Sequence, residues 1–256
     1  NIGLNKRFLI YDTDDQISLV KQIMKARGLT DKDIKPRAVL SAISNAKNEM
    51  RSVEDFSTST RGPREQKIAE LFFAYEKALK DASALDFDDL LIKTVELLRN
   101  KPDIRHKWQQ QFEHILIDEY QDTNAVQYAL IKLLVNSRRN LCVVGDDAQS
   151  IYSFRGADYT NILNFERDFP GTTVVKLEQN YRSTGAILNM ANALISHNIH
   201  RTDKNLWTAN GDGVEPKLWQ LYNESEEALA IANEIQAQIA NGRQYGDVAV
   251  LYRTNA

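Results

Sequence analysis

Carboxylate and amide side chains follow three short apolar runs in the middle of the sequence. The runs and the residues after them are 115–117 before Asp118-Glu119, 141–144 before Gly145-Asp146-Asp147, and 174–177 before Gln179-Asn180. If these runs are parallel strands, ligands bind beyond their carboxyl ends, so the side chains would share one edge of a sheet. An Asp-Glu pair there suits nucleotide hydrolysis, with Asp118 holding Mg²⁺ and Glu119 polarising the attacking water. The pair alone is equally compatible with a strand that ends in an acidic turn.

The sequence from residue 115 onward alternates apolar runs with helical periodicity. Further apolar runs lie at 218–221 and 248–252, and helices are expected at about 124–136, 158–168, 184–197 and 225–240. Short strands that alternate with helices are typical of an α/β fold whose parallel sheet is covered on both faces. Only a few residues follow the last run, so we expect a second α/β unit to be truncated.

The first hundred residues have mainly helical periodicity. The expected elements are a short strand at 8–11, helices from Asp14 to Gly28 and from Pro36 to about Met50, a polar loop at 57–63, and helices to about Ala84 and from Phe87 to Leu98. Basic residues near the polar loop could contact duplex phosphates, although a solvated surface is their more common role. These residues are Lys35, Arg37, Lys47, Arg51, Arg61, Arg64 and Lys67.

The composition argues against a membrane-spanning protein, a disulfide-stabilised protein and a histidine-based metal site. The 256 residues are 43% apolar and 26% charged, and no stretch approaches the roughly 20 apolar residues of a membrane span. Cys142 is the one cysteine, so no disulfide forms within the chain, which favours a reducing compartment, and its apolar neighbours predict a small core residue. The four histidines lack metal-ligand spacing, and the net charge of −3 requires any nucleic-acid site to be a local patch.

Three longer motifs carry a family resemblance. They read DEYQDTN from Asp118, GDDAQSIYSFRGA from Gly145 and QNYRST from Gln179. In this order they resemble motifs II, III and IV of the superfamily 1 helicases of the UvrD, Rep and PcrA type. The resemblance spans roughly residues 1–256 and is best defined from Leu85 to Thr184.

The resemblance implies an α/β fold of the RecA-like (P-loop NTPase) type, with a truncated parallel sheet and an inserted helical accessory domain. The implied domains are the helical accessory domain at 1–85, the remainder of the first RecA-like motor domain at 86–176 and the start of the second at 177–256. The implied activity is that of an ATP-dependent DNA helicase, which couples ATP hydrolysis to 3′–5′ movement on single-stranded DNA and to unwinding. Its partners would be single-stranded DNA, junctions with duplex DNA, and repair or replication proteins, in a cytoplasmic, nucleoid-associated location without a membrane.

The resemblance also implies roles for residues of an ATP site. Asp118 would bind Mg²⁺, Glu119 would be the general base, and Gln149 would sense the γ-phosphate. Tyr181 would stack on the adenine, and Arg182 would reach the γ-phosphate from the second motor domain. A planar guanidinium suits that last role, because phosphoryl transfer needs positive charge on the phosphate oxygens.

Aromatic residues beside an arginine suit single-stranded DNA, because bases stack on rings and phosphates attract positive charge. Tyr152, Phe154 and Arg155 provide this combination three to six residues after Gln149. Many members of the family have Trp at the position of Phe154. Phe87 lies in the segment LDFDDL, which resembles one that lines a base pocket in the family. For Phe87 and Tyr152, a place in the core is the alternative.

A phosphate loop of the form G-x-x-x-x-G-K-[ST] does not occur in the 256 residues. The chain also begins at Asn1 rather than at Met, so we expect an internal fragment of a longer ATPase that is inactive alone. Two alternatives stay open, namely a non-catalytic, helicase-derived DNA-binding or scaffolding subunit and a subunit of a helicase–nuclease. A phosphate loop in the coding sequence before Asn1 would favour the motor.

Overall fold

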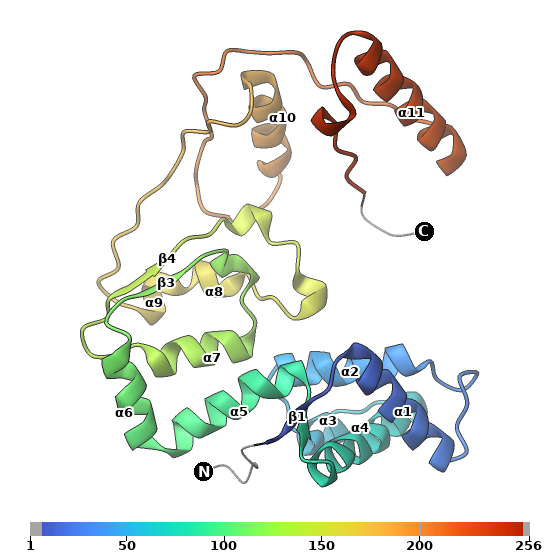
Figure 1. Ribbon diagram of the computed structural model, residues 1–256. Helices are drawn as coiled ribbons and strands as arrows, with labels where there is room; N and C mark the ends of the chain where they lie inside the picture. The colour runs from blue at the N-terminus through green and yellow to red at the C-terminus, as the bar shows by residue number, and fades with distance from the viewer. Residues whose placement is uncertain (1–6, 200, 253–256) are drawn as a thin grey trace. The chain divides into compact units, whose positions relative to one another are not determined.

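The computed structural model describes residues 7–199 and 201–252, apart from the side chain of Arg155. The described residues form two compact units, whose elements are shown in Figure 1. One unit is drawn from Asn1–Lys176 and Asn198–Asp203, and the other from Leu177–His197 and Lys204–Ala256. No described helix combines the length and the apolar character that crossing a membrane requires.

Helices dominate the beginning of the first unit and confirm three of the predicted ones. They are α1 (Thr13–Ala26), α2 (Pro36–Asn48) and α4 (Pro63–Asp81). Asp12 and Asp15 form a capping box that starts α1, and a proline occupies the first turn of both α2 and α4. Their apolar faces bury one core, in which the largest fully buried side chains are Val20, Met24, Val39, Ile43, Leu71, Phe72 and Tyr75.

A short helix and a small sheet complete this helical part. α3 (Val53–Thr58) begins at a capping box between Ser52 and Asp55, so the predicted loop at 57–63 is wrong at its first residues. β1 (Leu9–Ile10) lies within the predicted strand at 8–11 and pairs in parallel with β2 (Ala84–Leu85). The two residues of β2 are too few to show a strand period in the sequence.

A second parallel pair of strands follows two further helices. The elements are α5 (Phe87–Asn100), α6 (Pro102–Gln111), β3 (Ile115–Ile117), the 3-10 helix η1 (Tyr120–Asp122), α7 (Ala125–Leu134) and β4 (Leu141–Val143). Ile115 of β3 lies opposite Leu141 of β4, which confirms the strands predicted at 115–117 and 141–144. One face of the pair packs on a core of Tyr120, Ile131 and Phe165.

The other face of the β3–β4 pair is exposed, so the prediction of a sheet covered on both faces is wrong for the described residues. Side chains alternate between the two faces of a strand. Ile117 and Val143 pack on the core, whereas Leu116 is 76% exposed. Cys142 is exposed as well, which corrects its predicted place in the core.

Three predicted strands, at 174–177, 218–221 and 248–252, are wrong, because these residues form no strand. A strand requires hydrogen bonds to a neighbouring strand. Among the described residues such pairing occurs in β1–β2, in β3–β4 and at one isolated bridge between Gln179 and Trp207. The predicted helix at 158–168 is divided into two short helices, and the elements after β4 are η2 (Asp147–Gln149), η3 (Ser153–Arg155), α8 (Thr160–Leu163) and α9 (Phe165–Asp168).

The second unit consists of helices and extended segments. α10 (Gly185–Ile195) and α11 (Glu224–Ala240) confirm the helices predicted there, and η4 (Tyr245–Asp247) follows them. The N–H groups at the start of α10 donate to the carbonyls of Gly211 and Asp212, at 2.8 Å each.

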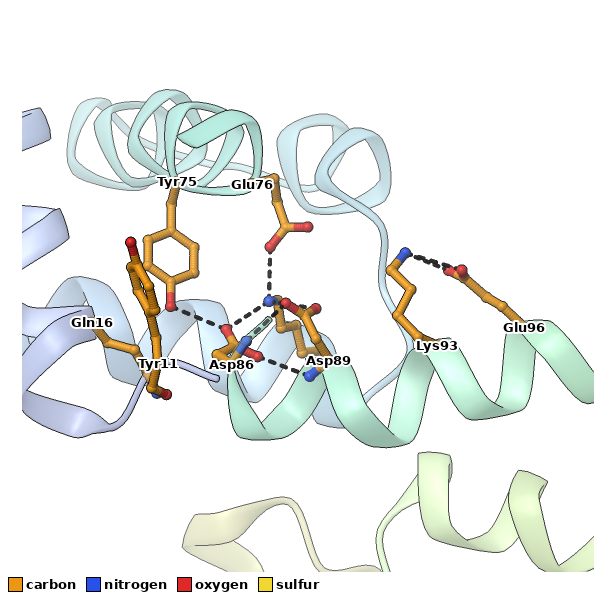
Figure 2. A network of polar contacts seen from close by, with 9 residues as sticks. Tyr11, Gln16, Tyr75, Glu76, Asp86, Asp89, Lys93 and Glu96 are labelled. Atoms are coloured by element: carbon orange, nitrogen blue, oxygen red, sulfur yellow. Dashed lines mark hydrogen bonds and ion pairs between the residues drawn. The ribbon is translucent and has the colours of Figure 1, made fainter. Parts of the chain in front are cut away.

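A buried ion cluster joins the helical core to the start of α5. Lys47 Nζ lies 2.7 Å from Asp86 Oδ2 and 2.8 Å from Asp89 Oδ1. Glu76 Oε1 lies 2.8 Å from the same ammonium, and the Tyr75 hydroxyl donates to Asp86 Oδ2 at 3.1 Å. In Figure 2 the side chains of Tyr75, Glu76, Asp86 and Asp89 converge from two helices. Lys47 is 3% exposed, so its predicted place among the surface basic residues is wrong.

This ion cluster sets one cation against three carboxylates, and the imbalance shifts the protonation of its members. Burial disfavours the charge of Lys47, but the carboxylates of Asp86, Glu76 and Asp89 outweigh it and raise the pKa of Lys47 above its usual value. Burial raises the pKa of Asp89 to about 6, against the attraction of Lys47 and with added repulsion from Asp86 and Glu76. Lys47 therefore stays charged, while Asp89 binds a proton in mildly acidic solution.

We expect Asp89 to lower the stability of the fold as the pH rises from about 4 to about 6. The pKa of Asp89 is about 6 in the fold and 3.8 ordinarily, so between these values the folded chain keeps a proton that the unfolded chain has lost. Its stabilising contribution is complete below pH 3.8 and is lost as the pH passes 6. Local unfolding of α5, measured by hydrogen–deuterium exchange corrected for the intrinsic effect of pH, should increase over this window in the wild type and less in Asp89→Asn.

Asp103→Asn provides the control for that measurement, because Asp103 is an exposed residue in the first turn of α6. Its pH dependence should match that of the wild type. A wild-type stability that rises relative to Asp89→Asn between pH 4 and 6 would contradict the raised pKa.

Candidate functional site

Asp118 and Glu119 lie at the carboxyl end of β3, where both side chains are exposed. Glu119 has φ 50° and ψ 43°, in the left-handed region that residues other than glycine rarely adopt. Its backbone N–H donates to Asp118 Oδ1 at 2.9 Å, which orients the Asp118 carboxylate. A backbone strained in this way is often found where a side chain must point in one direction for function.

Gln121 connects the ends of the two strands. Its side chain is fully buried, and its Nε2 donates to Glu119 Oε2 at 2.8 Å. Its Oε1 accepts the backbone N–H of Asp146, beyond β4, at 2.9 Å. Gly145 leaves room for this contact, because a Cβ there would lie 2.6 Å from Gln121 Oε1. The sequence-based prediction missed Gln121, although it stands inside the motif that begins at Asp118.

The connection continues to Gln149. Asp146 Oδ1 accepts the N–H of Ala148 at 2.9 Å and so caps η2. Gln149 Nε2 donates to Asp146 Oδ2 at 3.0 Å. A chain of hydrogen bonds therefore joins Glu119 to Gln149 through Gln121 and Asp146. The ends of β3 and β4 thus share one edge as predicted, whereas Gln179 and Asn180, predicted at the same edge, follow no strand.

The segment after Gln149, residues 150–157, carries exposed aromatic rings and is called the aromatic loop here. The rings of Tyr152 and Phe154 lie 5.9 Å apart and are tilted by 41°. Phe154 is 56% exposed and Tyr152 38%, and Phe87 at the start of α5 is 55% exposed. Neither Tyr152 nor Phe87 is a core residue, which removes that alternative. The side chain of Arg155 lies outside the described part of the structure.

Tyr181 and Arg182 belong to the second unit. Tyr181 is 78% exposed, and its hydroxyl donates to Gln179 Oε1 at 2.9 Å. Asn180 Oδ1 accepts hydrogen bonds from the N–H groups of Arg182 and Ser183 at 2.9 Å and 2.7 Å. These bonds shape the turn that carries the exposed side chains of Tyr181 and Arg182. Within its own unit, the structure thus keeps Tyr181 and Arg182 on one tight turn.

The chemistry of the β3 edge suits a magnesium ion. Asp118 offers a hard carboxylate oxygen, and Mg²⁺ in nucleotide sites usually takes one or two carboxylates, with phosphate and water oxygens as its other ligands. Among the described residues no group of three or more His, Cys, Asp or Glu side chains is arranged to hold a metal. A hollow of about 750 Å³ between α3 and α4 contains none of the predicted site residues in its lining.

Two family models match this chain. Residues 1–170 match the UvrD/REP helicase N-terminal domain, and residues 175–256 match the UvrD-like helicase C-terminal domain. The chain is 46% identical over 256 residues to the ATP-dependent DNA helicase PcrA of Bacillus subtilis. It is 44% identical over 255 residues to the proteins of the same name from Staphylococcus epidermidis and Staphylococcus aureus. The matches cover 100% of this chain and 35% of the length of each of these relatives.

We expect Gln121→Ala to release residues 145–149 from the end of β3. The substitution leaves the Asp146 N–H without its acceptor, at a cost of about 1–3 kcal/mol for a buried group. Hydrogen–deuterium exchange at Asp146 should therefore become about tenfold faster or more. Gln110→Ala, on the exposed surface of α6, is the matched control and should leave this exchange rate unchanged. An Asp146 amide that exchanges equally fast in both variants would show that Gln121 does not hold it.

Proposed function

Because this chain belongs to the UvrD/REP helicase family, we propose that it is part of an ATP-dependent DNA helicase. In this proposal, ATP hydrolysis drives 3′–5′ movement along single-stranded DNA and the unwinding of duplex DNA. The observation that carries the proposal is the strained Glu119 at the end of β3, which hydrogen bonds link to Asp146 and Gln149. The relatives, each named ATP-dependent DNA helicase PcrA, support the same activity.

Hydrolysis would be carried out at the edge of the β3–β4 pair. Asp118 would hold Mg²⁺, which when bound neutralises charge on the phosphates. The Gln121 amide holds Glu119 Oε2 at 2.8 Å, and this leaves Oε1 to accept the proton of the attacking water. Gln149 would bind the γ-phosphate and would then exchange its hydrogen bond to Asp146 for one to the nucleotide.

The second unit would complete the nucleotide site. The exposed ring of Tyr181 would stack on the adenine, and Arg182 would place its guanidinium against the γ-phosphate. The tight turn around Asn180 supports this proposal, because its hydrogen bonds fix the backbone that carries Tyr181 and Arg182. Charge on the transferred phosphoryl group is the usual target of such an arginine.

Single-stranded DNA would bind to Phe87 and to the aromatic loop. The exposure of Phe87, Tyr152 and Phe154 supports stacking on bases, and Arg155 would attract phosphates. Gln149 lies one residue before the aromatic loop, so a change in its partner would reach the DNA through a very short segment. This proximity would couple the state of the bound nucleotide to the affinity for single-stranded DNA.

The proposed domains are a helical accessory domain at 1–85, inserted into a RecA-like motor domain that continues at 86–176, and the start of a second motor domain at 177–256. The separate helical core around Tyr75 and the division of the chain after Lys176 support these limits. The unmatched gap between the two family models, residues 171–174, lies close to the last boundary and supports it. Junctions of single- and double-stranded DNA, repair or replication proteins, and a cytoplasmic, nucleoid-associated location belong to the same proposal.

We expect Glu119→Gln in the full-length protein to lower kcat for ATP by about a hundredfold or more while ATP still binds, because an amide cannot accept the proton. Steady-state phosphate release and nucleotide titration measure the two quantities. Glu113→Gln is the matched control, since Glu113 is an exposed residue before the opposite end of β3. Turnover by Glu119→Gln within a few-fold of the wild type would remove Glu119 from the proposed role.

We expect residues 1–256 alone to show no DNA-stimulated ATP hydrolysis and to bind Mg·ATP weakly. Backbone N–H groups and the lysine of a phosphate loop normally hold the β- and γ-phosphates, and the 256 residues contain no such loop. Phosphate release with and without single-stranded DNA tests this, with Asp118→Ala as the control. Turnover that disappears in Asp118→Ala would show that another element of the chain binds phosphate.

A further inference from the structure

We propose that Lys47 and Asn48, the last two residues of α2, are positioning residues. They would hold Phe87 and the aromatic loop, the two proposed DNA-binding segments, in fixed positions relative to each other. The inference rests on the proposed function, since it assigns a common support to Phe87 and the aromatic loop. Both residues are buried, at 3% and 9% exposure. Lys47 binds Asp86 and Asp89 at the start of α5, and Asn48 binds Asn124 at the start of α7 as well as Asp88 of α5.

Lys47 holds the start of α5. Asp86 is the N-cap of this helix, and its Oδ1 accepts the N–H of Asp89 at 2.8 Å. Asp89 Oδ2 accepts the N–H of Asp86 in return at 3.2 Å. The Lys47 ammonium binds one remaining oxygen of each carboxylate, at 2.7 Å and 2.8 Å. Phe87 is the first residue of α5, so its backbone lies between Asp86 and Asp89, the two capping residues that Lys47 binds.

Asn48 holds the start of α7 and the end of the aromatic loop. Its Oδ1 accepts a hydrogen bond from Asn124 Nδ2 at 2.7 Å, and Asn124 is the N-cap of α7. Gly156 in the aromatic loop rests on this pair, because a Cβ there would lie 3.1 Å from Asn48 Cβ and 3.9 Å from Asn124 Cβ. The φ of Gly156 is +79°, which glycine adopts without strain. The loop backbone after Phe154 is thereby seated on Asn48.

The two contacts share one rigid support. Consecutive residues of a helix project about 100° apart, so Lys47 and Asn48 can reach two different partners without a change in backbone. A displacement of the end of α2 would move Phe87 and the aromatic loop together. Buried polar contacts of this kind add little net stability compared with apolar packing, but their geometry is directional. Their use here is to fix where the two sets of rings lie.

A double-variant cycle in the full-length protein tests the Asn48 contact. Asn48→Ala, Phe154→Ala and the double variant are titrated with a fluorescein-labelled oligo(dT), and the DNA concentration for half-maximal ATPase stimulation is measured. We expect Phe154→Ala to weaken binding about 5- to 150-fold, the range for one base–aromatic stack. Asn48→Ala should weaken it about fivefold and raise the half-maximal DNA concentration more than it lowers kcat. The double variant should bind more tightly than the product of the two single effects predicts, because both changes act on one loop.

Asn45→Ala is the matched control, an exposed asparagine one turn earlier on α2, and should bind like the wild type. If Asn48→Ala does not fold, Asn124→Ser takes its place. Serine keeps the helix cap but is too short to reach Asn48. For the other contact, Lys47→Arg keeps the charge but replaces a compact ammonium with a wider planar group. Lys47→Arg should weaken DNA binding. The double variant Lys47→Arg, Phe87→Ala should bind more tightly than the product of the two single effects predicts.

The outcomes separate this inference from the proposed function. Wild-type affinity in both Phe154→Ala and Phe87→Ala would overturn the proposed DNA site and the inference with it. If these two variants bind weakly while Asn48→Ala matches Asn45→Ala, or if the effects multiply in the double variants, the DNA site stands and the positioning role of α2 is overturned. Weakened, non-additive binding in the Asn48 and Lys47 cycles supports the inference.

Discussion

The buried charge of Lys47 is the interaction on which the first unit depends. Removing an ammonium from water costs several kcal/mol unless carboxylates surround it. Glu76 from α4 and the capping pair Asp86 and Asp89 of α5 supply these carboxylates. α2 and α5 must therefore keep one mutual arrangement, since separating them would leave Lys47 without its two buried partners, and Glu76 links α4 to the same ammonium. The helical core and the helix that leads toward β3 become one body through this contact.

Buried polar contacts also attach two of the candidate functional segments, at smaller scale. Gln121 joins the ends of β3 and β4, and Asn48 joins α2 to the cap of α7. In each case a buried polar side chain binds a helix cap or a strand end, where backbone groups lack partners within their own element. Apolar packing sets how closely the elements approach, and these directional contacts set their register.

Local signals explain which parts of the fold could be predicted from the sequence. α1, α2 and α4 have amphipathic periods and their own caps or prolines, so neighbouring residues alone specify them. The run at 174–177 has three apolar residues, as β3 does, but it pairs with no neighbouring strand, and no local pattern contains that information. The motif order suggested Asp118, Glu119 and Gln149 as site residues, and the structure links Glu119 to Gln149 by hydrogen bonds. The motif order did not reveal Gln121 or the burial of Lys47, because both depend on residues distant in the sequence.

The backbone of Glu119 has a consequence for the evolution of this protein. Glycine or asparagine would adopt its φ of 50° more readily than glutamate does. A non-glycine residue in this region carries about 1–3 kcal/mol of strain, a noticeable share of the stability of an ordinary domain. If Glu119 has the proposed role, glutamate at this position exchanges part of the folding free energy for a carboxylate at the end of β3. Stabilising variants of this chain should be sought away from the end of β3, where such a gain would remove the carboxylate.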